Sequence, residues 1–153
     1  MTNRILEQFG LVRRQLNRLG IIYLKEIGLG PKQMLLLRFV HKHEHCTMTD
    51  IAGGVGSDKA SVTRMVNSLV EARYLELMHN KDDQRMIFVT LGSKAKKVIP
   101  QIERIYMRVS KDFASSLTAK EKTTLLSILK KIEPGLKITI DTAIEKNKTK
   151  ELI

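Results

Sequence analysis

Residues 58–91 read DKASVTRMVNSLVEARYLELMHNKDDQRMIFVTL, and the spacing of their apolar side chains changes halfway along. In the first half, apolar residues recur at intervals of three and four, which predicts a helix over residues 59–72 with one buried face. In the second half, apolar runs at 74–78 and 86–91 flank the polar loop HNKDDQR, which predicts an antiparallel hairpin. The stretch therefore predicts one helix that leads directly into a two-stranded wing.

The ten residues before this stretch predict a second short helix and a tight turn. Residues 47–56 read TMTDIAGGVG, and either Thr47 or Thr49 can cap a helix there. Three glycines would end that helix: Gly53, Gly54 and Gly56. Ser57 and Asp58 can then cap the next helix, so the two form a helix-turn-helix pattern.

Amphipathic helices are predicted on both sides of this pattern. The N-terminal one has a narrow apolar stripe: Ile5, Phe9, Val12, Leu16, Leu19 and Tyr23. A nearly continuous apolar helix over 31–43 would be central to the core. After the wing, a helix over 93–117 contains Pro100, and a capping box of Thr118 with Glu121 begins a last helix. Pro134 and Gly135 would interrupt or bend that last helix.

We therefore expect a mainly α (α+β) chain that forms a single domain over residues 1–153. Residues 31–91 would form a winged helix-turn-helix DNA-binding lobe with a two-stranded β-wing. The N- and C-terminal amphipathic helices, 3–27 and 93–147, would be dimerisation helices, because their apolar stripes exceed what one small core needs. Such a homodimer presents two recognition helices about one DNA turn apart, on the order of 34–36 Å, and reads a palindrome.

Composition narrows the possible partners. Lys and Arg number 27 against 16 Asp and Glu, a formal net charge of +11, which indicates a polyanionic partner such as double-stranded DNA. No apolar run is long enough to cross a bilayer and no signal core is present, so we expect a cytoplasmic protein without a membrane partner. No nucleophile elbow, phosphate loop or Cys-x-x-Cys pair occurs, which favours a binding protein without a cofactor over an enzyme.

The stretch from Asp58 resembles the DNA-binding lobe of the MarR family of bacterial transcriptional regulators. The resemblance rests on Val62-Thr63-Arg64, then Leu69, Tyr74-Leu75, the wing triplet Asp83-Gln84-Arg85 and a returning strand at 89–91. Three positions depart from the family pattern. Arg73 stands where the family usually has glycine, Leu77 where it often has a basic residue, and Gly92 where it usually has a capping threonine. Arg73 must therefore adopt a left-handed conformation or end the helix differently.

The predicted recognition helix carries the candidate DNA contacts. With its apolar face buried, helical geometry turns Ala60, Arg64 and Asn67 outward and leaves Lys59, Ser61 and Thr63 on the flanks. Arg64 suits a bidentate contact to guanine, and Ala60 suits a thymine methyl. Ser61 and Thr63 would reach base edges or phosphates, and Ser57 with the amides at the helix start suits a phosphate.

The wing supplies further candidates. The resemblance implies that Arg85 enters the minor groove and that the carboxylate of Asp83 holds the wing. Asn80 and Lys81 near the tip would add contacts to the DNA backbone.

Residues 41–46 read HKHEHC and hold three of the four histidines and the only cysteine. If the helix persists to residue 45, His41 and His45 share one face and are candidate metal ligands with Cys46. If it ends near His43, the stretch is a structural, pH-responsive helix end and Cys46 opens a short strand edge. Cys46 as an oxidant sensor is a further alternative.

The resemblance also implies a repressor released by a small-molecule effector, often an aromatic acid, bound between the dimer helices and the DNA-binding lobe. Candidate pocket residues are Tyr23, Phe39, Tyr106 and Phe113, although plain core or dimer packing is the simpler interpretation of each. A second class of function stays open: a winged-helix module that docks protein and does not bind DNA specifically.

Overall fold

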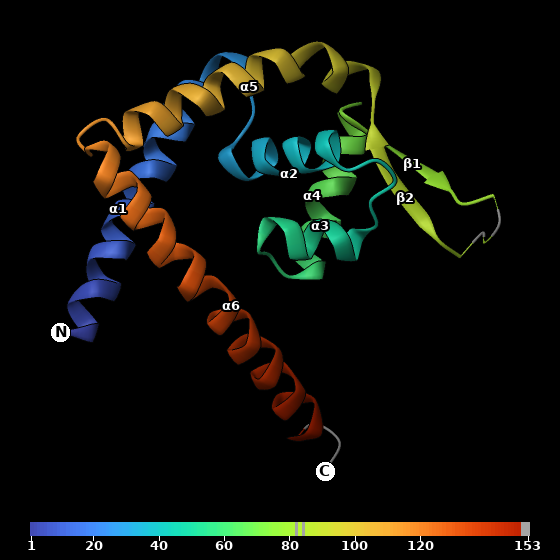
Figure 1. Cartoon of the computed structure of the whole chain (residues 1–153). Helices are drawn as coiled ribbons and strands as arrows, with labels where there is room; N and C mark the ends of the chain where they lie inside the picture. The colour runs from blue at the N-terminus through green and yellow to red at the C-terminus, as the bar shows by residue number, and fades with distance from the viewer. Residues whose placement is uncertain (82, 84, 151–153) are drawn as a thin grey trace. The chain divides into compact units, whose positions relative to one another are not determined.

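The computed structural model describes residues 1–81, 83 and 85–150. Two helices precede the helix-turn-helix, and a hairpin and two more helices follow it (Figure 1). The elements are α1 (Thr2–Leu24), a 3-10 turn η1 (Lys25–Ile27), α2 (Pro31–Lys42), α3 (Met48–Val55), α4 (Lys59–Glu71), β1 (Leu75–His79), β2 (Ile87–Leu91), α5 (Ser93–Phe113) and α6 (Ala119–Lys150). The predicted fold class, mainly helical with a two-stranded wing, is confirmed.

The chain divides into two compact units. Residues 1–112 form the first, which contains the helix-turn-helix and the wing, and residues from Phe113 onward form the second, which contains α6. Within the described residues, no helix combines the length and the apolar character that crossing a membrane requires.

α3 begins and ends through specific caps. The Thr47 hydroxyl accepts the Asp50 amide at 3.2 Å, and the Asp50 carboxylate accepts the Thr47 amide at 2.8 Å, so Thr47 and not Thr49 is the cap. Gly56 ends the helix at a φ of +62°. The expectation that Gly53 and Gly54 also end it was wrong. They lie inside α3, where a Cβ at Gly54 would collide with the Phe39 ring.

α4 ends with Arg73 in the left-handed conformation, which is unusual for a residue other than glycine. Arg73 adopts a φ of +62°, and its amide donates to the Val70 carbonyl at 2.9 Å. The Tyr74 amide donates to the Leu69 carbonyl at 2.8 Å, which completes a Schellman motif around a residue other than glycine. The chain then turns directly into β1.

The wing is an antiparallel pair whose register runs from Leu75 opposite Leu91 to His79 opposite Ile87. A single bridge extends the sheet on its inner edge, where the Val89 amide donates to the Cys46 carbonyl at 2.8 Å. The prediction that Cys46 opens a short strand edge is confirmed.

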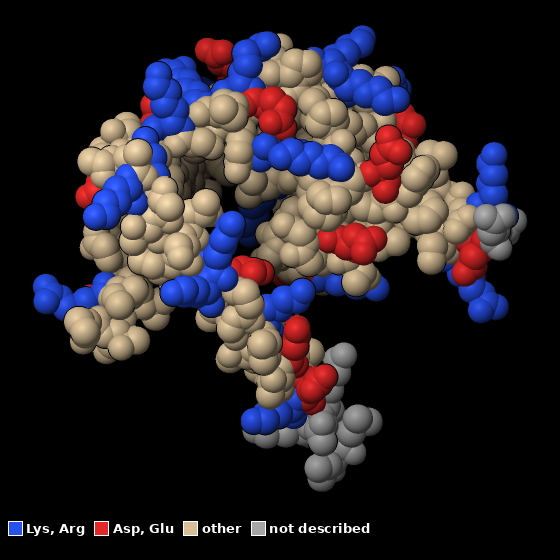
Figure 2. Space-filling model, viewed as in Figure 1, with Lys and Arg blue, Asp and Glu red and all other residues tan. Residues whose placement is uncertain are grey.

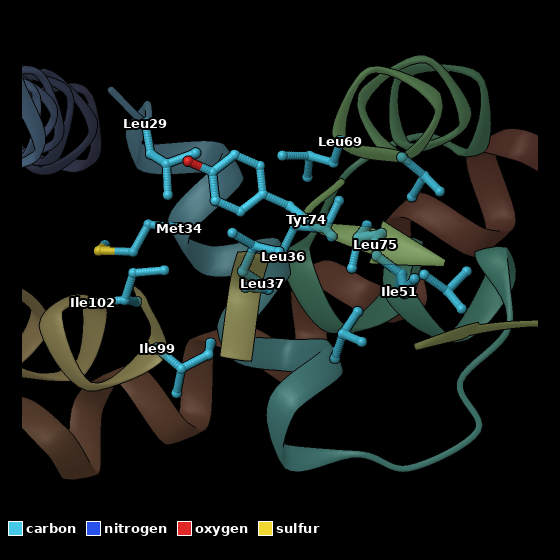
Figure 3. Packing of buried hydrophobic residues seen from close by; sticks show 14 of the residues in the cluster. Leu29, Met34, Leu36, Leu37, Ile51, Leu69, Tyr74, Leu75, Ile99 and Ile102 are labelled. Atoms are coloured by element: carbon cyan, nitrogen blue, oxygen red, sulfur yellow. The ribbon is translucent and has the colours of Figure 1, made fainter. Parts of the chain in front are cut away.

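The core of the first unit contains buried residues from α1, α2, α3, α4, both strands and α5 (Figure 3). Leu36 and Leu37 of α2 lie at its centre, and the buried face of α4 packs against it. Its fully buried larger side chains are Leu24, Leu36, Leu37, Ile51, Leu69, Leu75, Ile102, Val62, Val66 and Val89. This packing fixes the orientation of α4 relative to the wing.

α6 is one continuous helix, so Pro134 and Gly135 do not interrupt it, and a bend at this point stays a prediction. Pro134 is exposed, and the carbonyl that loses its partner there can bind water. The predicted capping box is confirmed: the Thr118 amide donates to the Glu121 carboxylate at 2.8 Å, and the Glu121 amide donates to the Thr118 hydroxyl at 3.3 Å. α5 ends at Phe113, four residues before the predicted Leu117.

Candidate nucleic-acid interface

α4 has one buried and one exposed face, as its sequence pattern predicted. Val62, Val66 and Leu69 are buried. The outward residues are Lys59, Ala60, Arg64 and Asn67, all exposed, and Ser61 and Thr63 are half-buried at the flanks. The helix therefore presents two cations, one amide and one methyl group along its open face.

Hydrogen bonds organise the N-terminal turn of α4. The Asp58 carboxylate accepts the Ser61 amide at 2.8 Å, and Arg64 donates to the Ser61 hydroxyl at 3.3 Å. Thr63 donates its hydroxyl proton to the Lys59 carbonyl at 2.8 Å. Hydrogen bonding by Ser61, through its side chain first and its amide second, lowers the pKa of Asp58. Asp58 is thus the N-cap, and the Ser57 amide is already bonded to the Ala52 carbonyl at 3.0 Å.

The wing loop is shaped by Asp83. Its carboxylate accepts the Arg85 amide at 3.0 Å, and its carbonyl accepts the Met86 amide at 3.0 Å. Asn80 is half-buried, and its backbone N–H donates to the Met86 carbonyl at 2.9 Å, which closes the loop. Lys81 and Arg85 are exposed, and Figure 2 shows basic side chains projecting on both sides of this loop. Gln84, in the predicted wing triplet, lies outside the described residues.

The HKHEHC stretch is a helix end. α2 ends at Lys42, so His41 and His45 do not share a helical face. The His43 ring bonds to the Phe39 carbonyl at 2.9 Å and stacks on the Phe39 ring, while His45 has a φ of +57° and its ring meets Phe88 edge-on at 5.4 Å. Across residues 1–81, 83 and 85–150, no three His, Cys, Asp or Glu side chains are grouped to hold a metal ion.

Cys46 is in an environment that suits a structural thiol. It is buried, and its Sγ lies 3.6 Å from the Val89 carbonyl. Burial raises the pKa of this thiol, which disfavours the reactive thiolate. The geometry therefore gives the oxidant-sensing alternative no support.

The candidate pocket residues lie in three separate settings. The Tyr106 ring is covered by the Arg38 guanidinium at 3.2 Å, and the Tyr23 ring by the Arg108 guanidinium at 4.2 Å. Phe39 lines a hollow of about 510 Å³ with the histidine-rich stretch and α3. Phe113 is exposed at the start of the second unit.

Sequence reasoning missed a charged cluster inside the lobe. Arg38 is buried on α2 and donates to both carboxylate oxygens of Glu103 on α5, at 2.7 and 3.1 Å. Hydrogen bonding by Arg38 lowers the pKa of Glu103. The signal in the sequence was a single cation within the apolar run 34–40, because such a residue is buried only when paired. This pair ties α2 to α5.

Comparisons with known proteins agree on one family. The model of the MarR family matches residues 27–86. The uncharacterized HTH-type transcriptional regulator YwhA of Bacillus subtilis is 28% identical over 97 residues, which cover 63% of this chain and 70% of YwhA.

Two solved structures show the same fold. A mutant of E. coli MarR complexed with operator DNA superposes with a TM-score of 0.79 at 23% identity, covering 84% of this chain and 93% of that one. BpsR of Bordetella bronchiseptica, whose DNA binding is regulated by 6-hydroxynicotinic acid, superposes with a TM-score of 0.77 at 16% identity, covering 87% and 93%.

Proposed function

Because this chain belongs to the MarR family of transcriptional regulators, which are not enzymes, we propose that it is a homodimeric repressor of transcription. It would bind a palindromic operator and be released from it by a small ligand. The observation that carries the proposal is the open face of α4, where Arg64 stands exposed above a fully buried apolar face.

In this proposal the N-terminal half of α4 enters the major groove. Arg64, steadied by its hydrogen bond to Ser61, contacts guanine O6 and N7, and Ala60 packs against a thymine methyl. Asn67 reaches a neighbouring base edge. Phosphates would be bound by the remaining polar residues at this end of the helix, Ser57, Lys59, Ser61 and Thr63.

The wing would contact the adjacent minor groove. The Asp83 carboxylate holds the Arg85 backbone in place, so the Arg85 side chain starts from a defined position. Lys81 and Asn80 would contact the DNA backbone and set the register of the protein on the duplex.

Two copies would associate through apolar residues that a single chain leaves in water. On α1, Ile5 is 62% and Phe9 is 56% exposed, and on α6, Leu136 is 57% exposed. Exposed apolar residues at helical spacing on two long helices indicate a partner surface. A two-fold dimer reads the two halves of a palindrome.

The ligand would be an aromatic acid. The exposed Arg108 guanidinium lies against the Tyr23 ring, which sets a cation beside an aromatic ring and suits a carboxylate attached to a ring. The regulation of BpsR by 6-hydroxynicotinic acid supports this class of ligand. Binding there would shift α5 against α1 or α2 and so change the spacing of the two recognition helices.

Fluorescence anisotropy tests the proposal with duplex from upstream of the protein's own gene and with a scrambled duplex, each titrated across salt concentration. We expect a preference for the native duplex that survives physiological salt. Arg64→Ala should cost about 1–3 kcal/mol per half-site, roughly 5- to 150-fold in affinity, and should relax the preference. Arg85→Ala should weaken binding by a similar factor.

The matched control is Lys42→Ala, which removes one exposed cation from the end of α2. Operator affinity should stay within about twofold of wild type in this variant, because the charge lost lies away from α4. If all three variants bind both duplexes as wild type does, the chain does not read DNA and the protein-docking alternative replaces the proposal. Aromatic acids that release the native duplex would identify the class of ligand.

A further inference from the structure

Most of the chain's positive charge lies outside the winged helix. Residues 31–91 contain eight Lys and Arg against seven Asp and Glu, so they carry only +1 of the net charge of +11. α5 alone, in its residues 93–112, contains six Lys and Arg against two acidic residues. The surface that reads an operator is therefore not the most basic surface of the molecule.

On α5, five cations follow one face of the helix. They are Lys94, Lys97, Arg104, Arg108 and Lys111, all exposed, with the neutral Gln101 between them. Spacings of three and four along this series place them in one row, which we call the α5 basic stripe. At 1.5 Å per residue the stripe is about 26 Å long. The two acidic residues of α5 are Glu103, which lies outside this row, and Asp112, which lies beside its C-terminal end.

The acidic residues of α5 are already engaged elsewhere. Glu103 pairs with the buried Arg38 of α2, and Asp112 accepts the Tyr23 hydroxyl at 2.6 Å. Acidic charge therefore adjoins the stripe only at its C-terminal end, where Asp112 and Arg108 both contact Tyr23.

Aromatic rings contact two cations of the stripe, Lys94 at its N-terminal end and Arg108 in its C-terminal half. The Lys94 ammonium lies 4.3 Å from the centre of the Tyr74 ring, and the Arg108 guanidinium lies 4.2 Å from the centre of the Tyr23 ring. Cation–π contacts restrict these long side chains and lower the entropy that they would lose on binding an anion.

The stripe faces away from the operator-reading surface. Ala95, Ile99 and Ile102 bury the opposite side of α5 in the core, and α2 lies between α5 and the helix-turn-helix (Figure 1). Figure 2 shows Lys and Arg along the edge of the molecule where Figure 1 places α5. We therefore expect a straight duplex across α4 and the wing tip to leave this face of α5 uncovered.

We propose that the α5 basic stripe binds the phosphate backbone of a second segment of duplex DNA, without reading its sequence. The charge complementarity is direct, since one DNA strand carries a phosphate about every 3.4 Å and the stripe spans about eight of them. Duplex DNA is also the polyanion that an operator-bound regulator meets at the highest local concentration. The stripe would thus let one molecule hold two duplexes. This inference rests on the proposed function, in which α4 and the wing bind the first duplex.

A capture experiment tests this second site with the full-length protein. Operator duplex is fixed to beads and saturated with protein, and the capture of a fluorescent duplex of unrelated sequence is measured across salt concentration. We expect protein-dependent capture of the second duplex. Affinity for the second duplex should fall with rising salt. For each phosphate contact that a stripe substitution removes, the magnitude of the slope of log affinity against log salt should fall by about 0.9.

The test variant is Lys97→Gln with Arg104→Gln and Lys111→Gln, which spares the two ring-bound cations. Its matched control removes three exposed cations from α6, Lys122→Gln with Lys130→Gln and Lys137→Gln. The stripe variant should lose second-duplex capture while operator affinity stays within about twofold, and the α6 variant should retain capture. Equal loss in both variants would mean that net charge alone matters, and undiminished capture in the stripe variant would exclude the stripe; either result overturns the proposal.

Two further arms separate this proposal from the proposed function and from another anionic partner. The first arm uses the Arg64→Ala, Arg85→Ala variant, and the duplex binding that this variant retains should disappear when the stripe substitutions are added. This result is expected whether or not the wild-type protein prefers an operator. Vesicles of anionic and neutral phospholipid provide the second arm. Vesicle binding that depends on the stripe, together with second-duplex capture that does not, would assign the stripe to a membrane surface and overturn the proposal.

Discussion

Arg73 occupies the point where the recognition helix, the wing and α5 meet. Its φ of +62° places a side-chain-bearing residue in a region that costs roughly 1–2 kcal/mol. Gly92, at the start of α5, lies so close that a Cβ there would be 2.7 Å from the Arg73 carbonyl oxygen. The Gly92 amide donates to the Tyr74 carbonyl at 2.9 Å. Two of the three departures from the family pattern, Arg73 and Gly92, are therefore neighbours in space.

Arg73→Gly should stabilise the protein. Glycine removes the cost of the left-handed conformation, and its greater freedom in the unfolded chain offsets part of that gain. We expect an increase of about 0.5–1 kcal/mol in the free energy of unfolding, measured by urea denaturation. Arg73→Ala is the control, because it removes the same side chain and keeps the strain. Equal gains in both variants would show that side-chain contacts and not backbone strain decide the effect.

Asp58 makes stability depend on pH in a defined direction. Hydrogen bonding by Ser61 holds the pKa of Asp58 below its ordinary value of about 3.9. Its contribution is present above that value and is lost as the pH falls through the lower folded pKa, since the unfolded chain takes up the proton first. Asp58→Asn keeps an oxygen acceptor for the Ser61 amide and removes the titration.

Urea midpoints between pH 5 and 3, on the scale of these carboxyl pKa values, should therefore fall less steeply in Asp58→Asn than in wild type. Some dependence should remain, because hydrogen bonding also lowers the pKa values of Asp50, Glu103 and Glu121. A variant with the full wild-type slope would show that Asp58 does not contribute to acid unfolding.

At the scale of elements, the contact between α2 and α3 depends on a pair of adjacent glycines. Gly54 faces the Phe39 ring so closely that no side chain fits there, whereas a Cβ at Gly53 would meet nothing within 4 Å. The Phe39 ring also stacks on the His43 ring, with ring centres 4.2 Å apart. The packing of α2 against α3 therefore requires glycine at position 54 and does not require it at position 53.

Gly54→Ala should destabilise the protein by about 1–3 kcal/mol, because the Phe39 ring must leave its place between α2 and α3. Gly53→Ala should stabilise it by about 0.5–1 kcal/mol, since alanine favours the helix and the site is open. Thermal unfolding of the two variants measures both effects. Destabilisation by Gly53→Ala to the same extent would show that helix capping, and not the Phe39 contact, requires the glycines.

At the scale of the whole molecule, one chain leaves much of its apolar surface uncovered. The apolar residues of α6 that are more than a third exposed include Leu126, Ile128, Leu129, Ile132, Leu136, Ile138, Ile140 and Ile144. A 32-residue helix with such a surface needs a partner, and we infer that a second copy of this chain supplies it.

Ile132→Glu combined with Leu136→Glu should shift the protein from dimer to monomer in sedimentation equilibrium, because burying two carboxylates in an apolar interface is costly. Affinity for a palindromic duplex should fall to that of a half-site. Thr123→Glu with Ser127→Glu adds the same charge to the opposite face of α6 and should leave the dimer intact. A dimer that survives the first pair would place the interface elsewhere.

By itself, the sequence determined the order of the elements and the open face of α4. Hydrophobic period and capping residues act over a few neighbouring positions, so Thr47, Asp58 and Thr118 could be read as candidate caps along the chain. The same local signals failed at Gly53, Gly54 and Pro134, where distant packing or solvent exposure decided the outcome.

Only the tertiary structure showed the pairing of Arg38 with Glu103, the closeness of Arg73 to Gly92, and the end of α2 that separates His41 from His45. Arg38 and Glu103 are 65 residues apart, and no local pattern encodes a contact across that separation. The α5 basic stripe was present in the sequence as a helical spacing. Its place on the far side of α2 from the helix-turn-helix came from the packing of the core, because burial of one face of α5 decides which face remains in water.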